Sequence, residues 1–173
     1  MEEKTCSFTG HRPQTLPFGY NERDPRCKKL KRVLRAEIIR QIRSGVTHFI
    51  SGMALGIDMY AAEIVLDLKK KFPCITLEAA IPCETQALKW REQDRDRYYG
   101  IIERCDKETL IQKQYSSDCM HKRNRYMVDQ ADVVIAVWNG QPSGTGKTVE
   151  YAIEKGKTVA VIDPVSRDVK EAM

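Results

Sequence analysis

The chain has 173 residues, 42% of them hydrophobic and 31% charged, so it is long enough for one sizeable core and short for two. Its 29 lysines and arginines exceed its 24 aspartates and glutamates by a net charge of +5, a modestly basic balance that tolerates an anionic ligand without requiring nucleic acid. The first residues lack the basic and apolar stretches of an export signal, and no apolar run reaches membrane-spanning length, so we expect one cytoplasmic domain over residues 1–173 and no membrane partner.

The cysteines indicate neither a metal site nor a disulfide framework. The six are scattered, none forms a C-x-x-C pair, and no histidine stands at zinc-ligand spacing from them. Reduced thiols in a cytoplasm are therefore expected, and no metal site is predicted.

Short apolar runs bounded by glycine and proline alternate with helix-period stretches along the chain. In chain order we predict a strand over 5–9, a helix over 26–44, a strand over 48–50, a helix over 55–71, a strand over 75–81, a helix over 90–104, a strand over 109–111, a helix over 118–130, a strand over 132–138, a helix over 148–155 and a strand over 158–162. This alternation is typical of an α/β protein in which helices flank a parallel sheet.

Local signals refine these elements. Pro13, Pro17 and Pro25 exclude a helix from the segment after the first strand, and a loop of that length is usually functional or mobile. Gly45 stands where a C-terminal glycine ends the first helix. The run over 132–138 is almost uniformly apolar, which is expected of a strand covered on both faces.

Three loops rich in small residues, over 9–12, 51–58 and 143–148, each follow a predicted strand. If these strands are neighbours in one parallel sheet, the loops meet at its carboxyl edge and form a crevice suited to phosphate. Glycine lets a ligand approach the backbone amides, and a helix N-terminus adds about half a positive charge. The alternative is that the glycines only permit close packing of helix on sheet.

Neither of the last two loops is a standard nucleotide motif. The 51–58 loop lacks the G-x-G-x-x-G spacing of dinucleotide-binding proteins, and the 143–148 loop is preceded by Gln141 where a P-loop requires glycine. Backbone amides at such a turn can still bind phosphate without ATP chemistry.

Basic residues follow in the helix predicted over 118–130, which leads into the strand before the last of these loops. Arg123 or Arg125 can therefore reach the same crevice and clamp a phosphate through two hydrogen bonds, although a solvated basic helix face is the plainer interpretation. Asp58 either stabilises the start of its helix or meets a ribose hydroxyl.

Five segments taken together resemble the YpsA-like branch of the SLOG superfamily. They are residues 7–13 (SFTGHRP), 51–58 (SGMALGID), 120–125 (MHKRNR), 131–137 (ADVVIAV) and 143–146 (SGTG) followed by Glu150. The match runs from the first strand to the last, and the order and spacing of the segments make it specific. The resemblance implies a Rossmann-like three-layer sandwich with a mainly parallel central sheet, which binds a nucleotide or nucleotide derivative such as an NAD-derived or ADP-ribose-like molecule.

Two other branches of the superfamily point to different functions. The 51–58 segment is similar to the S-G-x-A-x-G-x-D segment of the DNA-processing protein A group, which binds single-stranded DNA. Residues 120–123 are similar to the M-H-x-R segment of the LOG enzymes, which cleave the N-glycosidic bond of cytokinin nucleotides and release ribose 5-phosphate. The resemblance therefore leaves open whether the chain is an enzyme.

In the LOG enzymes the arginine that matches Arg123 and a glutamate after a P-G-G-x-G-T-x-x-E loop carry the chemistry. Here the proline-glycine-glycine opening is absent, and the glutamate position holds Thr148 when the loops are aligned on their G-T pair, so Glu150 fits only with an insertion. As an N-glycosidase, the chain would use Glu150 near the anomeric carbon, Arg123 on the phosphate and His11 as the acid for the leaving base.

We rank binding of a small-molecule nucleotide, as a sensor or binding module, above N-glycosidase activity and above binding of single-stranded nucleic acid. The basic face of the 26–44 helix favours nucleic acid, but stacking aromatics are few around it. In a binding module, the proline-rich loop and Trp90 would close over the base, unless Trp90 only packs in the core. No resident cofactor is predicted beyond the nucleotide-derived ligand, and a homodimer is the assembly that the resemblance allows.

The predicted site combines a catalytic pair with a larger binding set. The pair is Arg123 and Glu150. The ligand-binding set is Gly10, His11, Arg12, Ser51, Gly52, Met53, Gly56, Asp58, Arg123, Asn124, Gly144, Thr145, Gly146 and Thr148.

Overall fold

The computed structural model describes residues 2–172 of the chain. Its elements in chain order are β1 (Lys4–Gly10), the 3₁₀ helix η1 (Pro13–Thr15), α1 (Pro25–Arg43), β2 (Val46–Ser51), α2 (Ile57–Leu68), β3 (Thr76–Ile81), α3 (Glu92–Arg104), β4 (Lys107–Leu110), α4 (Cys119–Gln130), β5 (Val133–Val137), α5 (Gly144–Glu154), β6 (Thr158–Ile162) and β7 (Val169–Ala172). This succession confirms the predicted alternation of strands and helices.

The strands form one sheet with the order β4-β3-β2-β1-β5-β6-β7. Every neighbouring pair is parallel except β6 and β7, which run antiparallel. The strand order reverses at β1, because β2 lies on one side of it and β5 on the other. In open α/β sheets, ligands bind outside the carboxyl ends of the strands at such a switch point. The expected binding region is therefore at the ends of β1 and β5.

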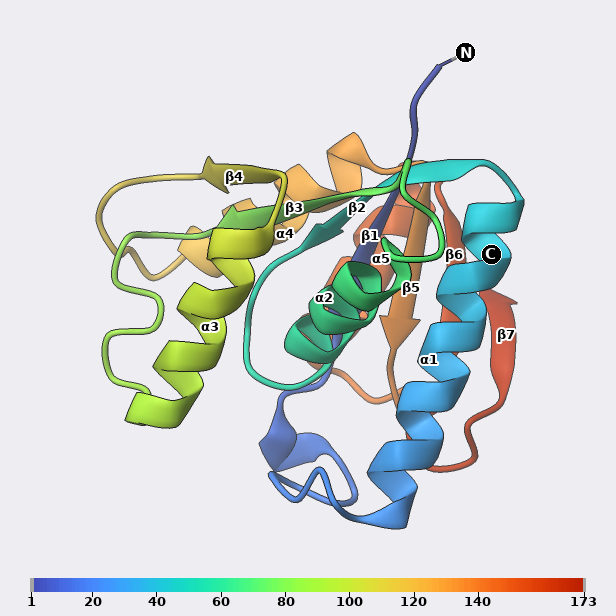
Figure 1. Ribbon diagram of the computed structural model, residues 1–173, viewed down its shortest axis with the longest axis horizontal. Coiled ribbons are helices and arrows are strands. Elements are labelled where there is room, and N and C mark those ends of the chain that lie inside the picture. Colours follow the sequence, from blue (N-terminus) through green and yellow to red (C-terminus); the bar gives the residue numbers. More distant parts are fainter. Residues whose placement is uncertain (1, 173) are drawn as a thin grey trace.

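Helices cover both faces of the sheet, with α1, α2 and α3 on one face and α4 and α5 on the other (Figure 1). Strand β5 shows why its sequence is apolar throughout. Ile135 packs in the cluster that contains Leu34 of α1, whereas Val134 packs in the cluster that contains Val149 of α5. The prediction of a strand covered on both faces is confirmed. Across residues 2–172, no helix combines the length and the apolar character needed to cross a membrane.

Apart from boundary shifts of up to three residues, the elements differ from the predicted ones at three places. Helix α5 begins four residues early, at Gly144, because the Ser143 side chain caps it by accepting a hydrogen bond from the backbone N–H of Gly146 at 3.0 Å. The proline-rich loop contains η1, whose first position tolerates proline. Strand β7 carries no predictive pattern, because three of its four residues are exposed.

The loop between β1 and α1 lies at the carboxyl edge of the sheet, drawn in blue at the bottom of Figure 1. Its Leu16 and Phe18 side chains are buried. Glu22, near its end, accepts hydrogen bonds from the guanidinium of Arg97 on α3 at 2.6 and 2.8 Å. The loop is therefore anchored to the helices beside the edge.

A buried carboxylate, Glu78, lies in the middle of β3. It accepts hydrogen bonds from Tyr126 at 2.6 Å and Thr109 at 2.9 Å, and His48 Nε2 lies 2.8 Å from it. Burial alone would raise the pKa of Glu78, but the hydrogen bonds from His48, Tyr126 and Thr109 outweigh it and hold the pKa at about 2.

We expect the protein to lose stability in acid through Glu78. Its pKa is lower in the folded chain than the ordinary 4.5, so its contribution is complete above that value and is lost as the pH falls toward about 2. A shift of this size corresponds to roughly 3 kcal/mol in the free energy of unfolding. Urea unfolding of the wild type and Glu78→Gln across this pH range should show a shallower loss in the variant. An equally steep loss in both would assign the acid sensitivity to other groups.

Candidate functional site

A cavity of about 440 Å³ opens at the carboxyl edge of the sheet, where β1 ends. It is enclosed by the loop after β1, the β2–α2 loop, the first turns of α4 and the N-terminus of α5. We call it the edge cavity. The predicted binding residues that line it are Gly10, His11, Arg12, Asp58, Arg123, Asn124, Gly144 and Thr145. The structure therefore brings the three small-residue loops and the basic helix together.

Arg123 is a buried cation in the wall of the edge cavity, with 4% of its surface exposed. Its Nη1 donates a hydrogen bond to the carbonyl oxygen of Gly52, and its Nε donates one to Asn124 Oδ1 at 2.8 Å. Within residues 2–172, it has no carboxylate partner within 4.0 Å. Burial lowers the pKa of Arg123, and the charge of nearby Asp58 opposes that effect. Such a guanidinium is suited to an anion that enters the cavity.

Gly52 allows this arrangement, because a Cβ there would lie 2.8 Å from both Cζ and Nη1 of Arg123. We expect Gly52→Ala to displace the guanidinium and to weaken the binding of a phosphate-containing ligand by about 10-fold or more, which is the loss of one charge-assisted contact. Calorimetric titration with AMP measures this change. Gly100→Ala on α3, where an added Cβ meets nothing within 4 Å, is the matched control and should bind like the wild type. Unchanged binding by the Gly52 variant would remove Arg123 from the site.

Asp58 is a second buried charge at the edge cavity. Its Oδ2 accepts a hydrogen bond from the Ala54 backbone N–H at 3.3 Å, and burial raises the pKa of its carboxyl while Arg123 lowers it. The Asp58 carbonyl oxygen accepts a hydrogen bond from Ser51 Oγ at 2.8 Å, and Met53 completes the turn at a φ of 59°. Ser51 and Met53 are fully buried and do not line the cavity, so they shape the loop that presents Asp58.

The N-terminus of α5 presents backbone amides to the edge cavity. Ser143 occupies the N-cap and satisfies the N–H of Gly146. Within residues 2–172, no acceptor pairs with the N–H groups of Gly144 and Thr145, and both residues line the cavity. Free amides at the positive end of a helix form an anion-binding site, and here they share a cavity with Arg123.

His11 is buried beside these amides. Its Nε2 accepts a hydrogen bond from the backbone N–H of Asn139 at 3.1 Å, so the proton of the neutral ring is assigned to Nδ1. Burial lowers the pKa of His11 below its ordinary 6.5, and the ring is neutral at pH 7. This environment favours a hydrogen-bonding role over the predicted role as an acid.

Two predicted glycines serve close packing instead of lining the edge cavity. Gly56 has a φ of 94°, and a Cβ there would lie 2.8 Å from the carbonyl oxygen of His11. A Cβ on Gly146 would lie 3.1 Å from the indole of Trp138. The packing interpretation of the small-residue loops therefore holds for these positions.

Glu150 does not share the edge cavity with Arg123. It is exposed, and together with Thr148 it lines another cavity, of about 580 Å³, beside α4 and α5, which adjoins the edge cavity at His121 and Asn124. Because Val149 and Ala152 point into the core, the helical repeat turns Glu150 away from the sheet. The predicted catalytic pair is therefore divided between two cavities.

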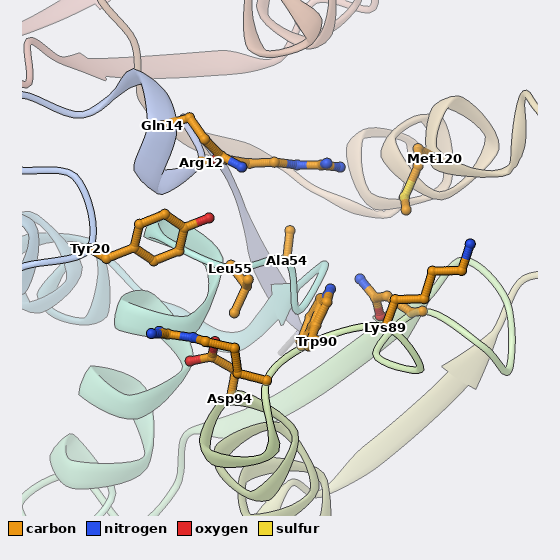
Figure 2. A pocket seen from close by; sticks show the side chains of 11 residues that line it. Arg12, Gln14, Tyr20, Ala54, Leu55, Lys89, Trp90, Asp94 and Met120 are labelled. Atoms are coloured by element: carbon orange, nitrogen blue, oxygen red, sulfur yellow. The ribbon is translucent and has the colours of Figure 1, made fainter.

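A third cavity of about 460 Å³ adjoins the edge cavity, and the two share Arg12, Gln14, Ala54 and Met120 (Figure 2). We call it the aromatic cavity, because Tyr20 and Trp90 line it. The sequence pointed to it through Trp90, Arg12 and the proline-rich loop, but not through Tyr20. Tyr20 carries no motif, and its place in the proline-rich loop is the one signal that could have indicated it.

Comparison of the sequence with known families decides the relationship. The YpsA model, described as the YspA SLOG family, matches residues 6–163. The chain belongs to this family. Among proteins similar to this family member, the UPF0398 protein of Bacillus cereus strain ATCC 14579 is 27% identical over 157 residues, which covers 89% of this chain and 85% of the relative. The UPF0398 protein of Bacillus thuringiensis strain Al Hakam matches with the same identity and coverage.

Solved structures show the same fold for this member of the YspA SLOG family. DNA processing protein A (DprA) from Streptococcus pneumoniae superposes with a TM-score of 0.63 at 18% identity, and the match covers 93% of this chain but 50% of that one. DprA from Helicobacter pylori gives 0.62 at 18% identity, with 92% and 65% of the two chains covered. This chain thus spans about half to two-thirds of the DprA chains. The Rossmann-like fold is confirmed.

Proposed function

We propose that this protein binds a nucleotide or nucleotide derivative in the edge cavity, as a sensor or binding module. The ligand phosphate would lie between the Arg123 guanidinium and the free N–H groups of Gly144 and Thr145. The observation that carries the proposal is the buried Arg123 without an ion-pair partner among residues 2–172. Asp58 would accept a hydrogen bond from a ribose hydroxyl.

The free-energy cost of burying the charge of Arg123 supports its proposed role in binding phosphate. A charge taken out of water is strongly disfavoured unless another group pairs with it, so an unpaired buried guanidinium works against folding. Gly52, Asn124 and Met120 supply only neutral atoms to Arg123. Asp58 acts on Arg123 only from beyond 4.0 Å, so a phosphate in the edge cavity would provide the negative charge in direct contact that Arg123 lacks.

A small ligand explains the geometry better than a nucleic-acid strand. DprA of Helicobacter pylori binds single-stranded DNA, which supports nucleotide recognition by this fold. The basic face of α1, however, is partly neutralised, because Lys31 pairs with Glu22 at 2.7 Å and Arg35 pairs with Asp67 at 2.8 Å. The proposed phosphate position lies in a cavity instead of along that face.

Thermal stabilisation tests this function when NAD, ADP-ribose and AMP are each added and the same samples are then analysed for released base. At a concentration of 100 Kd, a ligand adds about 2.7 kcal/mol of stability. For a chain of this size, that raises the melting temperature by roughly 5–10 °C. The nucleotide should be recovered whole.

Two results would contradict the proposal. No stabilisation by any of the nucleotides would exclude the binding site. Free base that disappears in Glu150→Gln would make the protein an N-glycosidase and would restore Glu150 to the site.

A further inference from the structure

The aromatic cavity differs in chemistry from the edge cavity that it adjoins. Tyr20, from the loop after β1, and Trp90, before α3, both point into it, and the small apolar side chains of Ala54 and Leu55 lie between them (Figure 2). Flat aromatic walls above an apolar floor are suited to a planar ring, because every nucleobase has a π-face that can stack.

The Trp90 wall packs against the core, and the Tyr20 wall has a cationic neighbour. The Trp90 ring meets the Tyr98 ring edge-on at 5.3 Å, and the Tyr98 hydroxyl donates a hydrogen bond to Gln86 at 3.1 Å. The Arg91 guanidinium lies over the Tyr20 ring at 5.4 Å. Because Trp90 is already packed, ordering its wall costs less entropy on binding.

Two cations at the aromatic cavity have no ion-pair partner in the part of the chain that the structure describes. Arg12 and Lys89 are exposed, and within residues 2–172 neither forms an ion pair. Arg12 lines both cavities and extends across their boundary toward Met120 (Figure 2). The boundary is therefore suited to a negative group that lies between a ring in one cavity and a phosphate in the other.

One backbone carbonyl fixes the two cavities relative to each other. The carbonyl oxygen of Gly52 accepts a hydrogen bond from Arg123 in the edge cavity and another, at 3.0 Å, from Nε2 of Gln86 in the aromatic cavity. A series of direct contacts thus connects the phosphate position to the aromatic wall. It runs from Arg123 through Gly52, Gln86 and Tyr98 to Trp90.

We infer that the two cavities form one bipartite site for a nucleoside diphosphate derivative, an inference that rests on the proposed function. The nucleobase stacks in the aromatic cavity on Tyr20 and Trp90. The diphosphate crosses the boundary at Arg12 and ends against Arg123. A mononucleotide fills only part of this site, so ADP-ribose is expected to bind more tightly than AMP or ribose 5-phosphate.

Calorimetric titration of the full chain with ADP-ribose and with ribose 5-phosphate tests the inference. Tyr20→Ala removes one stacking partner and should weaken ADP-ribose binding by about 10-fold or more, while ribose 5-phosphate binding stays unchanged. Trp90→Leu should weaken ADP-ribose binding in the same way. If the Trp90 variant fails to fold, Tyr20→Ala still tests the inference, because Tyr20 is half-exposed and its loss should not disturb the core. Tyr115→Ala, at an exposed tyrosine outside both cavities, is the matched control.

The outcomes separate this inference from the proposed function. Equal affinities for ADP-ribose and ribose 5-phosphate, or full ADP-ribose affinity in Tyr20→Ala, would overturn the bipartite site and leave the phosphate position standing. A thymidine oligonucleotide that binds more tightly than ADP-ribose, with a steep dependence on salt, would also overturn it in favour of a nucleic-acid strand. Failure of both small ligands to bind would reject the proposed function itself.

Discussion

Replacing Arg123 by methionine is expected to abolish nucleotide binding without lowering the stability of the free protein. The loss of a buried, charge-assisted phosphate contact should weaken binding by about 100-fold or more. Stability should hold, because the substitution removes a buried charge that lacks an ion-pair partner and leaves the Gly52 carbonyl bonded to Gln86. Asp58 keeps its hydrogen bond from the Ala54 N–H, and because burial raises its pKa, its carboxyl can take up a proton when the charge of Arg123 is lost. Calorimetric titration with AMP and thermal unfolding of the free variant measure the two effects.

Arg125→Met is the matched control, because Arg125 stands on the same helix. Arg125 is exposed, and its guanidinium lies 5.5 Å from the centre of the Tyr151 ring, outside the edge cavity. Its loss should leave AMP binding intact. Equal binding by the two variants, or a large drop in stability for Arg123→Met alone, would show that Arg123 is structural.

The second large effect is expected at Gly56, where alanine should destabilise the fold by roughly 3 kcal/mol or more. The backbone there has a φ of 94° and a ψ of −129°, a conformation essentially reserved for glycine. An added Cβ would also lie 2.8 Å from the carbonyl oxygen of His11. For a chain of this length, the melting temperature should fall by roughly 6–12 °C.

Gly156→Ala separates the two causes at Gly56. Gly156 has a φ of 73°, but an added Cβ there meets nothing within 4 Å. That variant carries only conformational strain and should lose about 1 kcal/mol. If both variants lose the same stability in thermal unfolding, the close approach of the two loops contributes nothing.

The sequence pattern predicted the fold because each of the predicted elements carries a local signal. The apolar run of β5 and the periodic positions of α1 reflect burial against neighbours on known sides of the sheet. Strand β7 was not predicted, because it is short and mostly exposed. The start of α5 was placed too late, because the cap by Ser143 adds a first turn of small residues without apolar periodicity.

The site was harder to predict where the rotation of a helix about its axis determines which side chain faces the cavity. Arg123 and Arg125 are two residues apart on α4 and so point in nearly opposite directions, and the sequence does not say which of them faces the sheet. Helix rotation also turns Glu150 away from the edge cavity, because α5 begins at Gly144. The aromatic cavity depends on the path of the loop that carries Tyr20, which no local pattern specifies. The homodimer and the cytoplasmic location stay predictions.

An amide NMR titration of the full chain with ADP-ribose tests whether the phosphate binds at the carboxyl edge of the sheet. We expect the backbone resonances of Gly144 and Thr145 to shift most, because their N–H groups receive the phosphate, while the resonance of Glu150 stays in place. Shifts confined to Glu150 and the other residues of its cavity, with Gly144 and Thr145 unmoved, would contradict a phosphate site at the carboxyl edge of the sheet.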